Sequence, residues 1–185
     1  MGKKKGKNKG SDGVSREDIK REKKLQAVLL ADSFTETFRP LSKNRPKVLL
    51  PLVNIPMLEY TLEFLASSGV DEVFVFCVSN AEQVGQYLEQ SKWMLAENSD
   101  KASLAGEGPT VQIVTSTACT SAGDALREID NSGVITSDPF VLISGDVISN
   151  IDLQAVIRTH EQRRKQNGIM TMVLKTVSSQ FVLMS

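Results

Sequence analysis

Two polar segments of the chain, residues 32–50 and 144–150, are the places where side chains could do chemistry. Each follows a strongly apolar run, Leu25–Ala31 in the first case and Pro139–Ile143 in the second, and such runs are typical of buried strands in a parallel sheet. Ligands of these sheets bind in the crevice outside the carboxyl ends of the strands. The two segments are therefore expected to hold any binding or catalytic site.

The histidine and the cysteines argue against a histidine-based metal site and against a disulfide framework. His160 is the one histidine and lies in a polar helical stretch, which favours a solvated surface residue over a metal ligand. Cys77 and Cys119 lie among apolar or small residues without CxxC spacing, which predicts reduced thiols in an intracellular, cytosolic protein. No apolar run approaches the roughly 20 residues of a membrane span. We expect no cofactor and no resident metal.

The first 24 residues carry a formal charge of +6, and the rest of the chain carries −6. Five lysines between positions 3 and 9 are spaced by glycine and asparagine, so they repel one another and bury nothing. We expect residues 1–24 to form a disordered arm. The arm could make a weak RNA contact by neutralising phosphates, or it could be a solubilising tail, which the absence of aromatic residues between the lysines favours.

Strands and helices are expected to alternate along the rest of the chain. Besides the two apolar runs, the patterns predict strands at Asp71–Val78, Val111–Val114 and Ile169–Lys175. Helices are expected at Pro56–Gly69, from Asn80 to Leu88 or Trp93, at Ser121–Ile129 and at Asp152–Arg164, with a loop at 96–109. Pro56 is expected in the first turn of its helix and Asn80 as an N-cap. The alternation predicts an α/β fold with a mostly parallel, doubly wound sheet.

The run from Leu29 to Val75, LLADSFTETFRPLSKNRPKVLLPLVNIPMLEYTLEFLASSGVDEVFV, resembles the opening of the nucleotide-sugar pyrophosphorylases. Their signature reads roughly L-A-G-G-x-G-T-R-L-x-P-L-T, followed by P-K. The later run PFVLISGDVISN resembles the segment in which the metal-binding aspartate of that family follows a strand. The likeness spans about residues 25–175. It implies a Rossmann-like, nucleotide-diphospho-sugar transferase-like fold, here truncated, and a reaction between a nucleoside triphosphate and a sugar phosphate.

The phosphate-binding part of that signature is altered. Alignment on Phe38, Pro40 and Leu41 puts the paired glycines at Asp32 and Ser33, the third glycine at Thr35 and the arginine at Thr37. Glycines let backbone N–H groups approach a triphosphate closely, which side chains obstruct. The carboxylate of Asp32 would repel phosphate, and the lost arginine removes a charge that stabilises the leaving group. We therefore predict that the site has no catalytic residue.

Two positions keep the residue types of the family. Lys47 matches the signature lysine that contacts phosphate, and Asp146, preceded by Gly145, matches the metal-binding aspartate. The resemblance would give Lys47 a phosphate-binding role and Asp146 a magnesium-binding role. The other interpretation, which we favour, makes them vestiges of the enzyme: Lys47 a surface charge, and Asp146 a turn residue or helix cap.

Three longer stretches, 26–77, 116–135 and 137–153, resemble the epsilon-subunit family of the eukaryotic translation initiation factor 2B complex. The resemblance implies the amino-terminal, pyrophosphorylase-like part of a larger subunit, whose carboxyl-terminal domain, absent here, catalyses guanine-nucleotide exchange on initiation factor 2. It implies as partners the gamma subunit most directly, the alpha, beta and delta subunits, and initiation factor 2 through the full complex.

The predicted organisation is thus a Lys-rich arm at 1–24, a partial nucleotidyltransferase-like domain at 25–178 and a divergent tail at 179–185. The expected function is that of a non-catalytic module that serves subunit assembly and the regulation of translation initiation. Two alternatives are an active sugar-phosphate nucleotidyltransferase that uses Lys47 and Asp146, and a domain that senses a nucleotide without turning it over.

Overall fold

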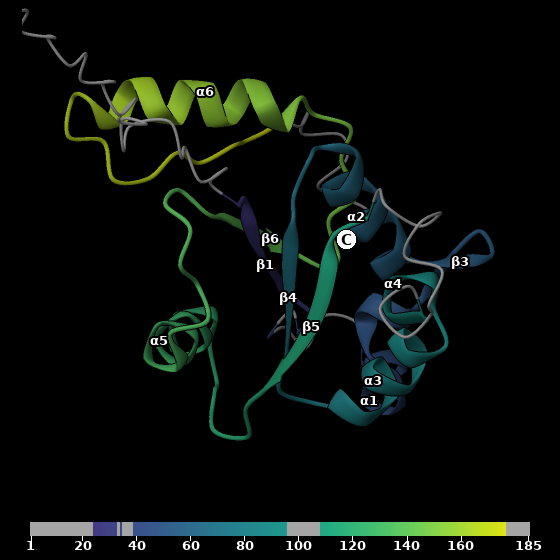
Figure 1. Cartoon of the computed structure of the whole chain (residues 1–185). Coiled ribbons are helices and arrows are strands. Elements are labelled where there is room, and N and C mark those ends of the chain that lie inside the picture. The colour runs from purple at the N-terminus through teal and green to yellow at the C-terminus, as the bar shows by residue number, and fades with distance from the viewer. Residues whose placement is uncertain (1–23, 33, 35–38, 96–107, 177–185) are drawn as a thin grey trace, which may run out of the picture.

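The structure is a computed structural model that describes residues 24–32, 34, 39–95 and 108–176 (Figure 1). In chain order its elements are β1 (Gln26–Leu30), α1 (Leu41–Asn44), η1 (Lys47–Leu49), β2 (Pro51–Leu52), β3 (Ile55–Pro56), α2 (Met57–Ser67), β4 (Glu72–Cys77), α3 (Ala81–Glu89), α4 (Lys92–Leu95), β5 (Thr110–Thr115), α5 (Ala122–Ser132), β6 (Val141–Ser144) and α6 (Leu153–Arg164). Within the described ranges, no helix is long and apolar enough to cross a bilayer.

Four strands form one parallel sheet in the order β5-β4-β1-β6. The chain runs outward from β1 through β4 to β5, and then returns to place β6 on the other side of β1. The strand order therefore reverses between β1 and β6, and a doubly wound sheet has its ligand crevice at such a point. The expected α/β class is confirmed.

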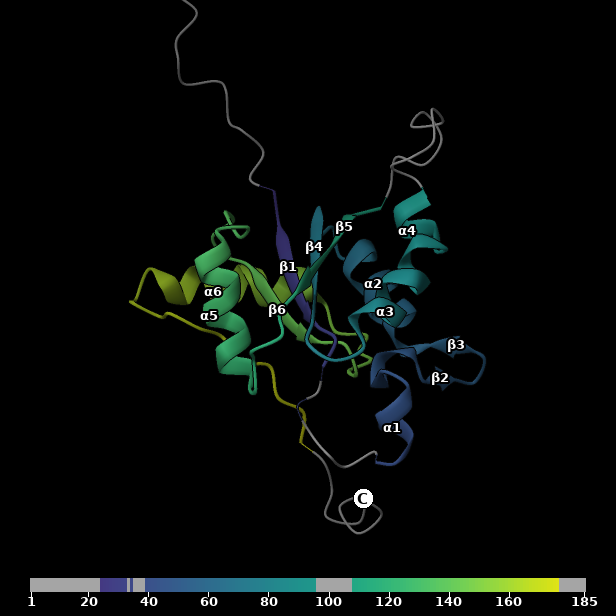
Figure 2. The same ribbon diagram turned by 90° about the horizontal axis from the view of Figure 1, so that it is seen from below.

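Helices cover both faces of the sheet, as Figure 2 shows with α5 on one side and α2 and α3 on the other. Alternation along β1 explains this arrangement, since Ala27 and Leu29 point to one face and Val28 and Leu30 to the other. The first face packs against apolar side chains of α2, α3 and Leu153, and the second packs against Ala125 and Ile129 of α5. Apolar residues on both faces account for the uninterrupted apolar runs in the sequence.

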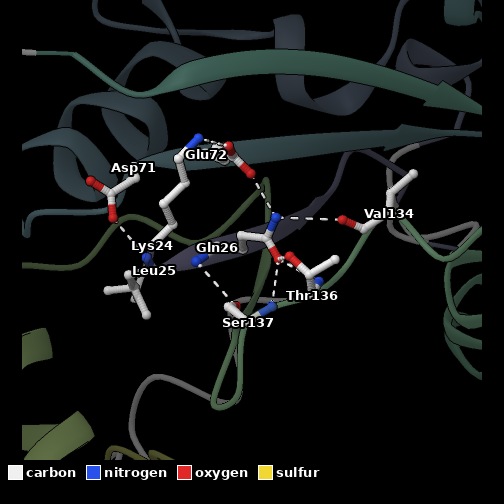
Figure 3. A network of polar contacts seen from close by, with 8 residues as sticks. All are labelled: Lys24, Leu25, Gln26, Asp71, Glu72, Val134, Thr136 and Ser137. Carbon is white, nitrogen blue, oxygen red and sulfur yellow. Dashed lines mark hydrogen bonds and ion pairs between the residues drawn. The ribbon is translucent and has the colours of Figure 1, made fainter. Parts of the chain in front are cut away.

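Gln26 is a buried polar residue in this sheet and fixes the loop that leads to β6 (Figure 3). Its side-chain oxygen accepts hydrogen bonds from the backbone N–H groups of Thr136 and Ser137, at 2.7 and 2.8 Å. Its Nε2 donates to Oε2 of Glu72 at 2.6 Å, and Oε1 of Glu72 pairs with Lys24. The network lies at the amino ends of β1 and β4, so it supports the sheet and not the ligand crevice.

The strand predicted at Ile169–Lys175 is wrong, since these residues form no strand. Ile169 and Leu174 are 96% and 83% exposed, and the Thr171 hydroxyl lies 3.1 Å from Nδ1 of His160 on α6. Apolar alternation reports strand propensity, whereas a strand also needs a neighbour that pairs with it. In the part of the chain described, β6 pairs only with β1.

Three details of the predicted helices are also corrected. Asn80 precedes α3 but adopts a left-handed conformation, and its side chain makes no capping hydrogen bond. Pro56 lies just before α2 instead of in its first turn. The helix does not continue from Leu88 to Trp93, because α3 ends at Glu89 and α4 begins at Lys92. The polar segment 32–50 contains α1 and η1, and the β2–β3 hairpin follows it.

Candidate functional site

Lys47 and Asp146, 99 residues apart in the sequence, meet at the carboxyl ends of β1 and β6. Nζ of Lys47 donates a hydrogen bond to Oδ2 of Asp146 at 2.6 Å, and the two side chains are 16% and 17% exposed. Lys47 opens η1, and Asp146 lies in the turn that leaves β6. Asp146 thus lies in a turn, and the side chain of Lys47 is largely buried.

Burial alone would raise the pKa of Asp146, because a charged carboxylate loses water. Hydrogen bonds from Lys47 and Ser144, together with the charge of Lys47, outweigh that effect and hold the pKa of Asp146 below its usual value. The Ser144 hydroxyl donates to Oδ1, so both carboxylate oxygens have a donor. The aspartate is therefore ionised and neutralised by side chains of the protein.

A magnesium ion at this position would compete with Lys47 and Ser144 for the carboxylate of Asp146. Mg²⁺ prefers an octahedral set of oxygen ligands that includes one or two carboxylates. Asp146 offers its two oxygens to Lys47 and Ser144, and the described residues contain no group of three or more histidine, cysteine or acidic residues that could hold a metal.

Gly145 and Thr61 set the position of Asp146. A Cβ on Gly145 would lie 2.6 Å from Cγ1 of Val48 and 2.9 Å from Cδ2 of Leu29, so the turn packs against η1 and β1 with no room for a side chain. The buried Thr61 of α2 has its hydroxyl 3.5 Å from the carbonyl oxygen of Gly145 and 3.3 Å from that of Val147. Close packing and α2 thus hold the turn in place.

The Gly145→Ala substitution is expected to lower the free energy of unfolding by about 1–3 kcal/mol, the range for inserting a methyl group into a packed core. Val48, which the methyl group meets first, adjoins Lys47, so the Lys47–Asp146 contact should also weaken. Urea denaturation followed by circular dichroism measures the effect. Gly123→Ala in α5 is the matched control: its Cβ meets only Ser121 Oγ at 3.7 Å, and stability should stay the same or rise.

Asp32, at the position of the first signature glycine, has a structural partner that the sequence did not indicate. Its Oδ2 accepts hydrogen bonds from the backbone N–H groups of Val78, at 2.5 Å, and Ser79, at 3.0 Å. The carboxylate therefore ties the segment after β1 to the carboxyl end of β4. A glycine at this position could not make this contact.

Phe34 lies in the same segment and has a φ of 52°, a left-handed value that is uncommon for a residue other than glycine. Its ring packs against the apolar cluster on the α5 face of the sheet. A bulky side chain thus lies between the positions of the second and third signature glycines, Ser33 and Thr35. Those two residues, with Thr37, lie outside the described residues, as do the arm at 1–23, the tail at 179–185 and most of the loop at 96–109.

The histidine and the cysteines take no part in the Lys47–Asp146 contact. His160 is half-buried on α6, where its ring contacts Thr171. Both cysteines are free, and burial, followed by the charge of Asp32, raises the pKa of the Cys77 thiol to about 12. Cys77 is therefore a protonated core residue at neutral pH.

Comparisons with known proteins agree with this fold. Translation initiation factor eIF2B subunit epsilon of Dictyostelium discoideum is 46% identical over 177 residues, 94% of this chain and 23% of the relative. The protein of the same name from Schizosaccharomyces pombe is 47% identical over 156 residues, 83% of this chain and 22% of the relative. The chain thus spans less than a quarter of the length of these two relatives.

Solved structures show the same architecture. UDP-glucose pyrophosphorylase from Acinetobacter baumanii superimposes with a TM-score of 0.59 at 21% identity, over 76% of this chain and 54% of that one. A sequence model described as nucleotidyl transferase matches residues 26–180, which include the sheet, Lys47 and Asp146. By its sequence match and its fold, this chain belongs to the nucleotidyl transferase family.

Proposed function

We propose that this chain is a non-catalytic nucleotidyltransferase-like module that serves the assembly of the guanine-nucleotide exchange factor for translation initiation factor 2, in the cytosol. The contact of Asp32 with the N–H groups of Val78 and Ser79 carries the non-catalytic part of the proposal. A negatively charged side chain, held by two hydrogen bonds, stands where a phosphate-binding turn has its first glycine. Release of that side chain would be required before a triphosphate could approach the backbone there.

The pairing of Lys47 with Asp146 supports the same function. In an active enzyme these two residues would bind a phosphate and a metal, and each would have to leave the other to do so. Their 2.6 Å contact is largely buried, and breaking such a contact costs several kcal/mol when one charge is left without its partner. The pair is better suited to joining η1 to the β6 turn.

The role in assembly rests on the similarity to two proteins that are each named as the epsilon subunit of eIF2B. A subunit acts as part of a larger complex. Guanine-nucleotide exchange would belong to a part of such a subunit outside the quarter that this sequence matches. The proposed partners are the gamma subunit first, then the alpha, beta and delta subunits, with initiation factor 2 bound through the complex. A weak RNA contact by the Lys-rich arm is a minor addition.

Affinity purification of the tagged chain, co-expressed with the other four subunits, tests the proposal. We expect stoichiometric recovery of at least one of them. Recovery of a folded chain alone, with folding checked by circular dichroism, would contradict the assembly role.

The enzymatic alternative predicts release of pyrophosphate from GTP or UTP in the presence of a sugar phosphate. We expect no release above that of a Lys47→Ala control. The sensing alternative predicts heat on titration with GTP, GDP-mannose or UDP-glucose, and we expect none.

Restoring the signature, with glycine at positions 32, 33 and 35 and arginine at 37, is expected to increase affinity for a nucleoside triphosphate at least tenfold, with little effect on subunit recovery. The glycines reopen the approach to the backbone, and the arginine adds a charge that binds phosphate. Isothermal titration calorimetry measures the affinity. Unchanged affinity would mean that the pocket is lost beyond this turn.

A further inference from the structure

A surface that combines apolar and polar side chains lies along α2 and is not used by the site described above. Its first part is a groove of about 580 Å³ between α2 and residues 148–154. Tyr60 and Phe64 of α2 line one wall, and Ile148 and Ile151 line the other. The second part is the β2–β3 hairpin, whose Leu52, Val53 and Ile55 are all exposed and which projects from the body of the molecule (Figures 1 and 2).

Tyr60 joins the two parts. It lines the groove, and its hydroxyl donates a hydrogen bond to the carbonyl oxygen of Leu52 at 3.3 Å. The opposite wall is held by Thr61, whose hydroxyl lies within 3.5 Å of the Gly145 and Val147 carbonyl oxygens. The surface is therefore fixed to a helix of the core before any partner binds, and such preorganisation lowers the entropic cost of association.

Val53 at the tip of the hairpin is unusual in two ways. Its φ is 63°, a left-handed value that strains a β-branched residue, and it is 92% exposed. It is the first residue of a two-residue turn, a position where glycine is preferred and asparagine is tolerated. An apolar side chain that is both strained and exposed contributes nothing to folding, whereas it could serve as an anchor in a partner.

The charges around the groove indicate the chemistry of that partner. Among the residues that line the groove, the charged ones are Glu63 and Asp152, both acidic and both exposed. Their ion pairs with Lys92 and Arg158 lie at the surface, where such pairs contribute little and exchange readily. A partner with basic side chains around an apolar patch would complement this surface.

We infer that the α2 groove and the β2–β3 hairpin together form the face on which this chain docks another subunit of the complex, one that presents an apolar patch bordered by lysine or arginine. The inference rests on the proposed function, since it names the surface through which assembly occurs. The partner accepts Val53 in an apolar pocket and pairs with Glu63.

Val53→Asn and Glu63→Lys test this surface, with Ile169→Asn as the matched control for an exposed β-branched residue outside it. Each variant is co-expressed with the other four subunits, and its affinity for the subunit that the unmodified chain recovers is measured. We expect Val53→Asn and Glu63→Lys each to weaken binding at least about tenfold, and Ile169→Asn to leave it unchanged. Val53→Asn should also raise or maintain the melting temperature, because it relaxes the turn; a purely structural role for Val53 predicts the opposite.

Three results would overturn the inference. If the unmodified chain recovers a subunit and both variants bind it equally well, the docking face lies elsewhere while the assembly function stands. If the unmodified chain recovers no subunit, both the proposed assembly function and the proposed docking face are contradicted. If the chain alone is a dimer in light scattering and Val53→Asn makes it a monomer, the occupant is a second copy of this chain and not another subunit.

Discussion

Replacing Gln26 with leucine is expected to lower the free energy of unfolding by about 1–3 kcal/mol, because two part-buried backbone N–H groups lose their acceptor and each such hydrogen bond contributes about 0.5–1.5 kcal/mol. The two groups belong to Thr136 and Ser137, which precede β6. Leucine fills a similar volume, so the effect reports the lost hydrogen bonds and not a cavity. Chemical denaturation followed by circular dichroism measures it.

Gln83→Leu is the control for this substitution, because Gln83 lies exposed on α3 and its amide makes one hydrogen bond, to the Asn44 carbonyl oxygen. Gln83→Leu should change the free energy of unfolding by no more than about 0.5 kcal/mol, as most surface substitutions do. A second readout is the pKa of Glu72, which hydrogen bonds from Lys24 and then Gln26 hold below its usual value. That pKa should rise in Gln26→Leu. Equal stability of the two variants would contradict the role assigned to Gln26.

Asp146→Asn is expected to lower the free energy of unfolding at pH 7 by about 2–4 kcal/mol, because removing one member of a largely buried ion pair leaves the other charge uncompensated. Asparagine keeps the shape of the side chain, so the Lys47 ammonium loses a negative charge and little packing. Denaturation at neutral pH, with the exposed Asp130→Asn as control, measures the difference. A loss of stability no larger than that of the control would mean that the Lys47–Asp146 pair makes no net contribution to the free energy of unfolding.

The difference in stability between the wild-type chain and Asp146→Asn should depend on pH, and the sign of this dependence follows from the pKa of Asp146. The folded pKa of Asp146 lies below its unfolded value of about 3.9, so the stabilisation is complete above that value and is lost as the pH falls through the folded pKa. The gap between the wild-type chain and Asp146→Asn should be constant from pH 7 to about pH 5 and shrink below pH 4. The Lys47→Met/Asp146→Asn double variant should recover part of the loss at pH 7, since no charge remains.

Strands with two apolar faces could be predicted from the sequence. After their first residues, Gln26 and Glu72, β1 and β4 are uninterrupted apolar runs because helices cover both sides of the sheet, and their observed limits lie within one residue of the expected ones. Residues 169–175 have comparable apolar content, but among the described residues no strand lies beside them. The residue pattern of one segment does not show whether a neighbouring strand is present, because strand pairing depends on residues elsewhere in the chain.

The candidate site could be predicted in part. Two segments were expected at the carboxyl ends of strands, and Lys47 and Asp146 do meet there, because the order of the strands puts β6 beside β1. The role of Asp32 could not be predicted, since its partners, the N–H groups of Val78 and Ser79, lie 46 and 47 residues away. The hairpin was also missed, because its strands have only two residues each and Val53 is not a typical turn residue.

The position of β1 in the middle of the sheet has a consequence for the order of folding. The pairing of β1 with β4 joins residues such as Ala27 and Val73, whereas its other edge pairs with β6, where Ala27 faces Val141. The longer loop between β1 and β6 costs somewhat more entropy to close, and contacts between residues distant in the sequence slow folding. During synthesis the β1–β4 unit can therefore form early on the ribosome, while one edge of β1 stays open until β6 emerges. Chaperones that bind exposed strand edges would have their longest opportunity in that interval.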